Sequence, residues 1–342
     1  MHTQRQIGLP GLAGHGRVFA IDAARGFAIF AMVVAHTAPY LRPAPKAIGS
    51  VEGLLNDVAA PLFALIIGVT IARTAPSQAG ASVGIDARAG RRAYRWQTGK
   101  KGLILIALGL ALTLAPSGVV VVLQYLGVTM LLLIPLLFLR TRALLALAAG
   151  LIVIAPGIIT VGRELVLVMP ALQYPATPFT MLLDWTVLGR SYQAVILLSM
   201  ALLGIAIGRA ALDTSRVLVT VLVVSVVAFL PAQVWATLDL PGTTVRGGYV
   251  EVLRETPLAV GTFAFIAWAT HAARDRVRRV SRAVFAPIVP QGRMALSIYV
   301  FHVVLLMGVV AVQAPQNPWV AAWMTWPRGA LIQVGLVVLC AV

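Results

Sequence analysis

The chain has 342 residues, of which 60% are hydrophobic and only 11% are charged. This balance excludes an ordinary soluble domain, in which about a quarter of the residues carry a charge. The formal net charge is +16, from 27 basic and 11 acidic residues. Membrane proteins keep basic residues in cytoplasmic loops and near anionic lipid, so this charge calls for no nucleic acid as a partner.

Apolar runs of about 20 residues recur along the whole chain, the length that a helix needs to cross a ~30 Å hydrocarbon core. The runs are continuous rather than alternating, which favours helices over the strands of a membrane barrel. We therefore predict an all-α fold, a polytopic membrane helix bundle of about ten transmembrane helices. The predicted spans are Val18–Tyr40, Leu54–Ala72, Lys101–Ala115, Val119–Leu139, Ala143–Val161, Ser191–Ile207, Val217–Thr237, Pro257–Thr270, Met294–Val312 and Ala330–Val342.

The basic residues divide unequally between the two sides of such a bundle. Nineteen of the 27 fall on the side of the N-terminus and seven on the other side, while Arg25 lies inside the first span. This asymmetry predicts a cytoplasmic N-terminus. We predict a cytoplasmic tail over residues 1–17 and a single transmembrane domain over residues 18–342. The last residues are still apolar, so the final span is either tucked into the bundle or truncated.

Two histidines fall inside predicted spans, His36 in the first and His302 in the ninth. A titratable group at membrane depth is costly, and such groups usually mark functional sites. Imidazole can accept and donate a proton near neutral pH, which makes either ring a candidate catalytic base. A packing role, or a proton relay in a transporter, is the alternative for both residues.

Three charged residues in the first two predicted spans are candidates for a supporting role. Asp22 and Arg25 are three residues apart, so they share a helix face and can pair, with Asp22 as a structural or orienting group. Arg25 lies roughly 16 Å before His36 along the same helix face. Asp57 enters the second span from the outer side, where it could fix the tautomer of His36 or simply cap the helix.

Other charged residues could contact substrates. Arginines suit bidentate contacts with phosphate, although topology also explains an inner basic loop. The candidate donor-binding residues are Arg25, Arg91, Arg92, Arg95 and Arg293. The outer residues Glu251 and Arg190 are candidates for binding a polar acceptor. No histidine or cysteine spacing typical of a metal site is present in the sequence, so we predict no metal.

Several motifs give the chain a family resemblance. The opening Asp22-x-x-Arg25-Gly26, followed by Met32 and His36, resembles the first helix of bacterial membrane proteins related to heparan-alpha-glucosaminide N-acetyltransferase and of YeiB-like proteins. The other similar segments are Asp57–Gly68, Gln124–Gly127, Gly204–Arg209 and Gly292–His302.

The resemblance implies transfer of an acyl group, in the simplest case acetyl, from acetyl-CoA in the cytoplasm to an extracytoplasmic sugar or glycolipid. It implies a catalytic membrane histidine, here His36 oriented by Asp57, with His302 as the reserve candidate. It also implies a bacterial cytoplasmic membrane. In the family the histidine stands nearer to the aspartate, whereas here His36 precedes Asp57 by 21 residues. A homodimer, a proton-coupled transporter or lipid-handling protein, and a non-catalytic scaffold remain open.

Overall fold

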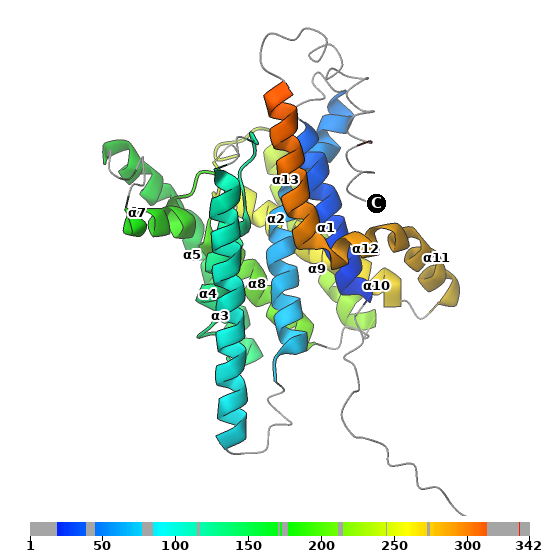
Figure 1. Ribbon diagram of the computed structural model, residues 1–342. Coiled ribbons are helices and arrows are strands. Elements are labelled where there is room, and N and C mark those ends of the chain that lie inside the picture. The colour runs from blue at the N-terminus through cyan, green and yellow to red at the C-terminus, as the bar shows by residue number, and fades with distance from the viewer. Residues whose placement is uncertain are drawn as a thin grey trace, which may run out of the picture.

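A computed structural model describes residues 19–38, 45–76, 85–114, 117–169, 172, 177–210, 215–243, 245–271, 274–312 and 335. Within these residues, all regular secondary structure is helical (Figure 1), which confirms the predicted all-α class. The helices are α1 (Phe19–Thr37), α2 (Lys46–Thr74), α3 (Ile85–Thr113), α4 (Leu123–Leu133), α5 (Thr141–Val168), α7 (Pro178–Leu183), η2 (Asp184–Leu188), α8 (Ala194–Arg209), α9 (Ser215–Thr237), α10 (Tyr249–His271), α11 (Asp275–Phe285), η3 (Ala286–Ile288), α12 (Val289–Arg293) and α13 (Ala295–Val312).

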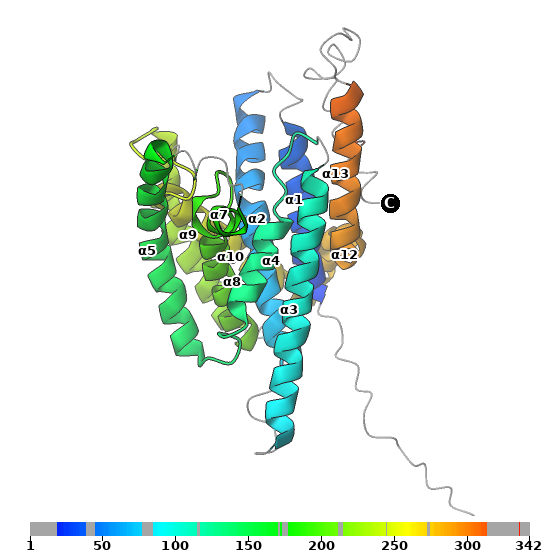
Figure 2. The same ribbon diagram turned by 60° about the vertical axis from the view of Figure 1, so that its left-hand side comes forward.

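The long helices run up and down side by side and form an elongated bundle (Figures 1 and 2). We call the end at which α1 begins the inner end, and the end at which α1 finishes the outer end. At the inner end, α3 extends beyond its neighbours, and α11 lies across the bundle rather than along it (Figure 1). The charge asymmetry of the sequence predicts that the inner end faces the cytoplasm.

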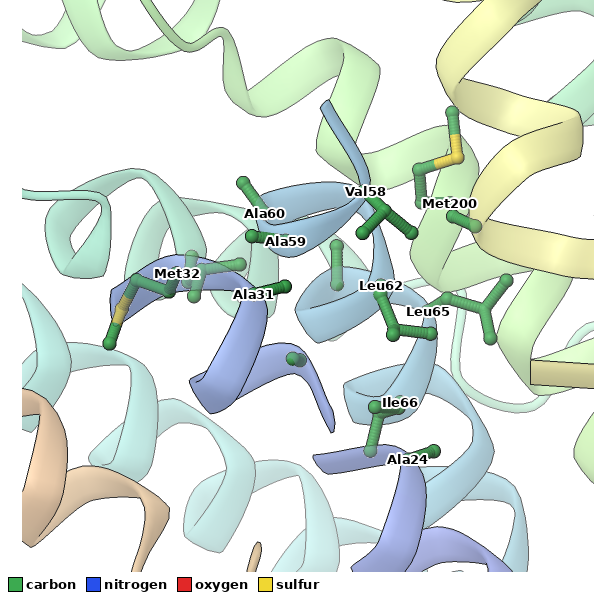
Figure 3. Close-up of a cluster of buried hydrophobic side chains, with 14 of the residues drawn as sticks. Ala24, Ala31, Met32, Val58, Ala59, Ala60, Leu62, Leu65, Ile66 and Met200 are labelled. Atoms are coloured by element: carbon green, nitrogen blue, oxygen red, sulfur yellow. The ribbon is translucent and has the colours of Figure 1, made fainter. Parts of the chain in front are cut away.

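Helices α1 and α2 form the centre of the bundle. In each of them 67% of the most apolar stretch is buried, compared with 28% in α5 and 17% in α9. The central core contains Met32 of α1, and Leu62 and Leu65 of α2 lie close to Met200 of α8 (Figure 3). The apolar side chains that α5 and α9 leave exposed form a surface suited to lipid.

Glycines allow the closest helix contacts. A Cβ added to Gly204 of α8 would lie 2.0 Å from the carbonyl oxygen of Leu65, and one added to Gly68 would lie 1.9 Å from that of Ala201. The backbones of α2 and α8 therefore touch directly. This is the packing that small residues spaced four apart on a membrane helix promote.

The number of spans is smaller than predicted. In the described residues, four helices are long and apolar enough to cross a membrane, namely α1, α2, α5 and α9, or five if the bent pair α11–α12 and α13 counts as one. The other predicted spans up to Met294–Val312 also coincide with helices. Of these helices, α3 and α10 carry too many charged residues, and α4 and α8 are too short, to meet the length and hydropathy expected of a membrane span. Apart from Gly335, the last predicted span, Ala330–Val342, lies outside the described residues.

The predicted span Val119–Leu139 differs most from the structure. Only Leu123–Leu133 is α-helical, and the chain from Ser117 to Val122 enters the bundle as an irregular segment. Non-helical backbone is tolerated at membrane depth where it is buried in protein or lines a cavity. Val121 and Val122 are buried, while Gly118, Val119 and Val120 line a cavity.

Candidate active site

His36 and His302 meet in the outer half of the bundle, although they belong to α1 and α13. Nδ1 of His36 and Nε2 of His302 are 3.0 Å apart, a hydrogen-bond distance. Their rings stack with centroids 5.2 Å apart and an interplanar angle of 12°. One nitrogen must donate and the other must accept, so the two rings hold a proton between them.

Tyr299 fixes the position of His302 from the other side. The ring of Tyr299 lies edge-on to the His302 ring, with centroids 5.1 Å apart and an interplanar angle of 85°. The Tyr299 hydroxyl accepts a hydrogen bond of 3.0 Å from the backbone N–H of Val122. This bond ties α13 to the segment before α4. His302 is buried, whereas His36 is half-buried and reaches a cavity.

The cavity beside His36 has a volume of about 300 Å³. Its walls come from α1, α2, the segment before α4, the loop before α8, α8 and the start of α10. The polar residues that line it are His36, Asn56, Ser191, Tyr192, Gln193, Arg246, Glu251 and Glu255. Since the contributing ends of these helices lie at the outer end, the cavity that His36 lines is in the outer half of the bundle.

Asp57 binds a different partner from the one that the sequence suggests. Its carboxylate accepts hydrogen bonds from the Arg254 guanidinium and, at 3.4 Å, from the Asn56 side-chain amide. The ion pair with Arg254 joins α2 to α10. In the described part of the chain, the side-chain hydrogen bond of His36 goes to His302.

Glu251 organises the outer loop above the cavity. Its carboxylate accepts hydrogen bonds from Arg246, at 2.6 Å, and from the backbone N–H of Gly247. Gly247 has a φ of +71°, a conformation that glycine adopts without strain. Burial lowers the pKa of the Arg246 guanidinium, but the nearby carboxylates, Glu251 first among them, together more than offset this effect, and the pKa is raised above its usual value. Arg246 therefore presents a permanent positive charge at the cavity.

Arg190 lies next to the cavity wall. Its side chain is exposed and does not line the cavity, whereas the next residue, Ser191, does. Burial raises the pKa of the Asp184 carboxyl in η2, and the nearby Arg190 guanidinium partly offsets this rise. Arg190 is thus placed at the rim rather than inside the cavity.

Asp22 forms ion pairs with two of the predicted donor-binding arginines near the inner end. Arg25 donates to Asp22 Oδ1 at 3.1 Å, and Arg293 donates to Asp22 Oδ2 at 3.4 Å. Arg25 also donates to the Thr70 hydroxyl at 3.2 Å and to the Gly292 carbonyl at 3.3 Å. The spacing of Asp22 and Arg25 correctly predicts their ion pair, but it does not predict the second ion pair of Asp22, with Arg293.

The other predicted donor-binding arginines lie on the inner half of α3. The guanidinium carbons of Arg91 and Arg95 each lie 5.4 Å from the centroid of the Phe138 ring. Arg92 is exposed. Helix α3 also contacts α2, since the Tyr94 hydroxyl lies 2.8 Å from the Thr74 hydroxyl of α2. Two separate groups of arginines therefore lie towards the inner end, one at α1 and α12 and the other on α3.

Sequence reasoning missed Tyr192 and Asn56 as lining residues of the cavity. The polar run Arg190-Ser191-Tyr192-Gln193 directly precedes an apolar helix. This position at the end of a predicted span could have marked Tyr192 as a candidate for lining a site. Asn56 stands beside Asp57, and nothing in the sequence distinguishes it from a helix-capping residue.

Comparison with known protein families assigns the chain to a family. A model of the family described as heparan-alpha-glucosaminide N-acetyltransferase, catalytic, matches residues 17–236. The chain belongs to this family. The matched region includes His36 and Asp57, and membership indicates membrane N-acetyltransferase activity in general, with acetyl-CoA as the general donor.

A second family model, described as a protein of unknown function (DUF418), matches residues 209–341. It contains His302, Glu251 and Arg293, so the histidine pair joins one residue from each matched region. The two matches confirm the resemblance to heparan-alpha-glucosaminide N-acetyltransferase and YeiB-like proteins. No curated protein matches the chain.

Proposed function

We propose that this protein transfers an acetyl group from acetyl-CoA, bound at the inner end, to an amine or hydroxyl of a sugar or glycolipid that enters the outer cavity. The membrane in question is the bacterial cytoplasmic membrane. The observation that carries the proposal is the contact between His36 and His302 beside a cavity at the outer end. The same helix that bears His36 carries Arg25 near the inner end.

In the proposed reaction, His36 removes a proton from the acceptor nitrogen or oxygen. The acceptor then attacks the thioester carbonyl of acetyl-CoA, so that a C–N or C–O bond forms and the C–S bond breaks. The proton leaves on the CoA thiol. His302 acts by sharing the proton that His36 receives, which keeps the charge of the imidazolium spread over two rings. General base catalysis of this kind contributes about 10²–10⁴ in rate.

The remaining predicted residues would act in binding. Arg25, Arg293 and the α3 arginines would contact the CoA phosphates. Asp22 would hold Arg25 and Arg293 in place, and Asp57 would hold the wall of the cavity through Arg254. Glu251 and Arg246 would contact the polar acceptor, with Arg190 at the rim. The positions of these residues at the inner end or beside the cavity support the proposed roles.

The test uses the purified full chain in vesicles of known orientation, with acetyl-CoA labelled in the acetyl group and glucosamine as the probe acceptor. Label supplied at the inner end should appear on glucosamine supplied at the outer end. His36→Ala should lower the rate by about 10²–10⁴ while insertion into the membrane is unchanged.

Equilibrium binding of acetyl-CoA to the same preparation provides a second, simpler measurement. A transporter or scaffold predicts no binding and no label on the acceptor. Full activity of His36→Ala, or equal transfer when both substrates are supplied at the outer end, would contradict the proposal.

A further inference from the structure

We propose that a groove on the lipid-facing side of the bundle binds an anionic phospholipid of the inner leaflet. The groove has a volume of about 340 Å³ and lies between α9, α10 and the end of α11, with α1 at its base. Its lining is almost entirely apolar and includes Phe27, Val226, Phe229, Phe265 and Phe285. Val226 and Phe265 are 49% and 46% exposed, so the groove is open to the surrounding lipid.

The dimensions of the groove match an acyl chain. Along α10 the lining runs from Pro257 to Ile266, nine residues on, which corresponds to roughly 14 Å of helix. One leaflet contributes about half of the ~30 Å hydrocarbon core. The groove is therefore about as long as one leaflet is thick. Gly261, which stands in its wall opposite Ser225, keeps the space between α9 and α10 free of a side chain.

Helix α11 supplies a headgroup site at the inner mouth of the groove. Its last residue, Phe285, lines the groove, and the exposed Val280 and Val284 lie one turn apart on one apolar face of the helix. The unit from Asp275 to Arg293 is bent by 78° from α13, so α11 lies across the bundle axis. A short helix with an apolar face and a basic face in this position is typical of the membrane interface.

Two arginines of α11 face outward and are available for a phosphate. Arg278 pairs with Asp275, and the Nε of Arg282 donates to the carbonyl of Thr270 at 3.2 Å. Arg276 and Arg279 are exposed, and neither makes a hydrogen bond or ion pair with the described residues. An anionic headgroup complements these charges, whereas a zwitterionic headgroup leaves no net attraction. The proposal concerns a site apart from the histidine pair and does not depend on the acetyl-transfer reaction.

The experiment titrates the detergent-solubilised full chain with phosphatidylglycerol or phosphatidylcholine and measures bound lipid by native mass spectrometry. Phosphatidylglycerol should bind at least tenfold more tightly. The double variant Arg276→Gln/Arg279→Gln should weaken phosphatidylglycerol binding by roughly fivefold per arginine and leave phosphatidylcholine binding unchanged. Its matched control is Arg140→Gln/Arg142→Gln, two exposed arginines at the inner start of α5, which should change nothing.

A second pair of variants tests the groove itself. Val226→Trp fills it and should weaken phosphatidylglycerol binding at least fivefold, whereas Val223→Trp, at a similarly exposed position on α9 outside the lining, should have no effect. Inorganic phosphate in millimolar excess should not displace the lipid, because the acyl chain contributes to binding. Equal affinity for the two lipids, equal effects of variant and control, or displacement by phosphate would overturn the proposal.

Discussion

Gly26 and Gly292 bring the backbones of α1 and α12 into direct contact. A Cβ added to Gly292 would lie 1.9 Å from the carbonyl oxygen of Asp22 and 2.8 Å from the amide nitrogen of Gly26. From this contact both chain segments run towards the outer end. His36 follows Gly26 by ten residues, and His302 follows Gly292 by ten residues. The contact therefore sets the height at which the two imidazoles meet.

Gly292→Ala should lower the rate of acetyl transfer at least tenfold. The added methyl cannot fit against the Asp22 carbonyl, so α12 must move away from α1 and carry His302 with it. A misplacement of about 1 Å can cost 10²-fold in rate. The matched control is Gly308→Ala on the same helix as His302, where an added Cβ meets nothing within 4 Å among the described residues. Steady-state rates of the two variants, each checked for folding, decide the matter. Equal rates would exclude this contact as a determinant of the histidine pair.

Arg254→Met should destabilise the protein by about 3 kcal/mol, because it leaves the Asp57 carboxylate buried without its cation. The double variant Arg254→Met/Asp57→Leu removes both charges and should recover most of this loss. Denaturant titration of the two variants and of Asp57→Leu alone measures the coupling. Additive losses would show that the ion pair does not join α2 to α10 in the way described.

Arg25→Gln should weaken acetyl-CoA binding by roughly 10- to 100-fold, the equivalent of one hydrogen bond to a charged group. Arg142→Gln removes an exposed arginine at the inner start of α5 and serves as the control. Isothermal titration gives both dissociation constants. The proposed donor site would be misplaced if the two variants bound acetyl-CoA equally well.

Much of the helical architecture could be predicted from the sequence, because apolar length is a local property. The pairing of Asp22 with Arg25 was also local, as their spacing of three residues fixes it. The irregular segment before α4 was not predictable, since its apolar residues have the composition of a helix. There, burial and the hydrogen bond between Val122 and Tyr299 determine the conformation.

The contacts that form the candidate site join residues far apart in the sequence, and the spacing of apolar residues along the chain does not predict such contacts. His36 and His302 are 266 residues apart, and the pairing of Asp57 with Arg254 spans 197 residues. The sequence identified both histidines as costly at membrane depth. It could not show that each would be the partner of the other, because this depends on how α13 packs against α1.

The most direct test of the histidine pair is a double-mutant cycle on the rate of acetyl transfer. His36→Ala, His302→Ala and the double variant are compared in the same oriented vesicles, with acetyl-CoA binding measured as a control. If the two rings act as one proton-sharing unit, the double variant will be about as slow as His36→Ala alone, because groups that act together are strongly non-additive. Fully additive losses, or a His302→Ala enzyme with the original rate and pH profile, would contradict this mechanism.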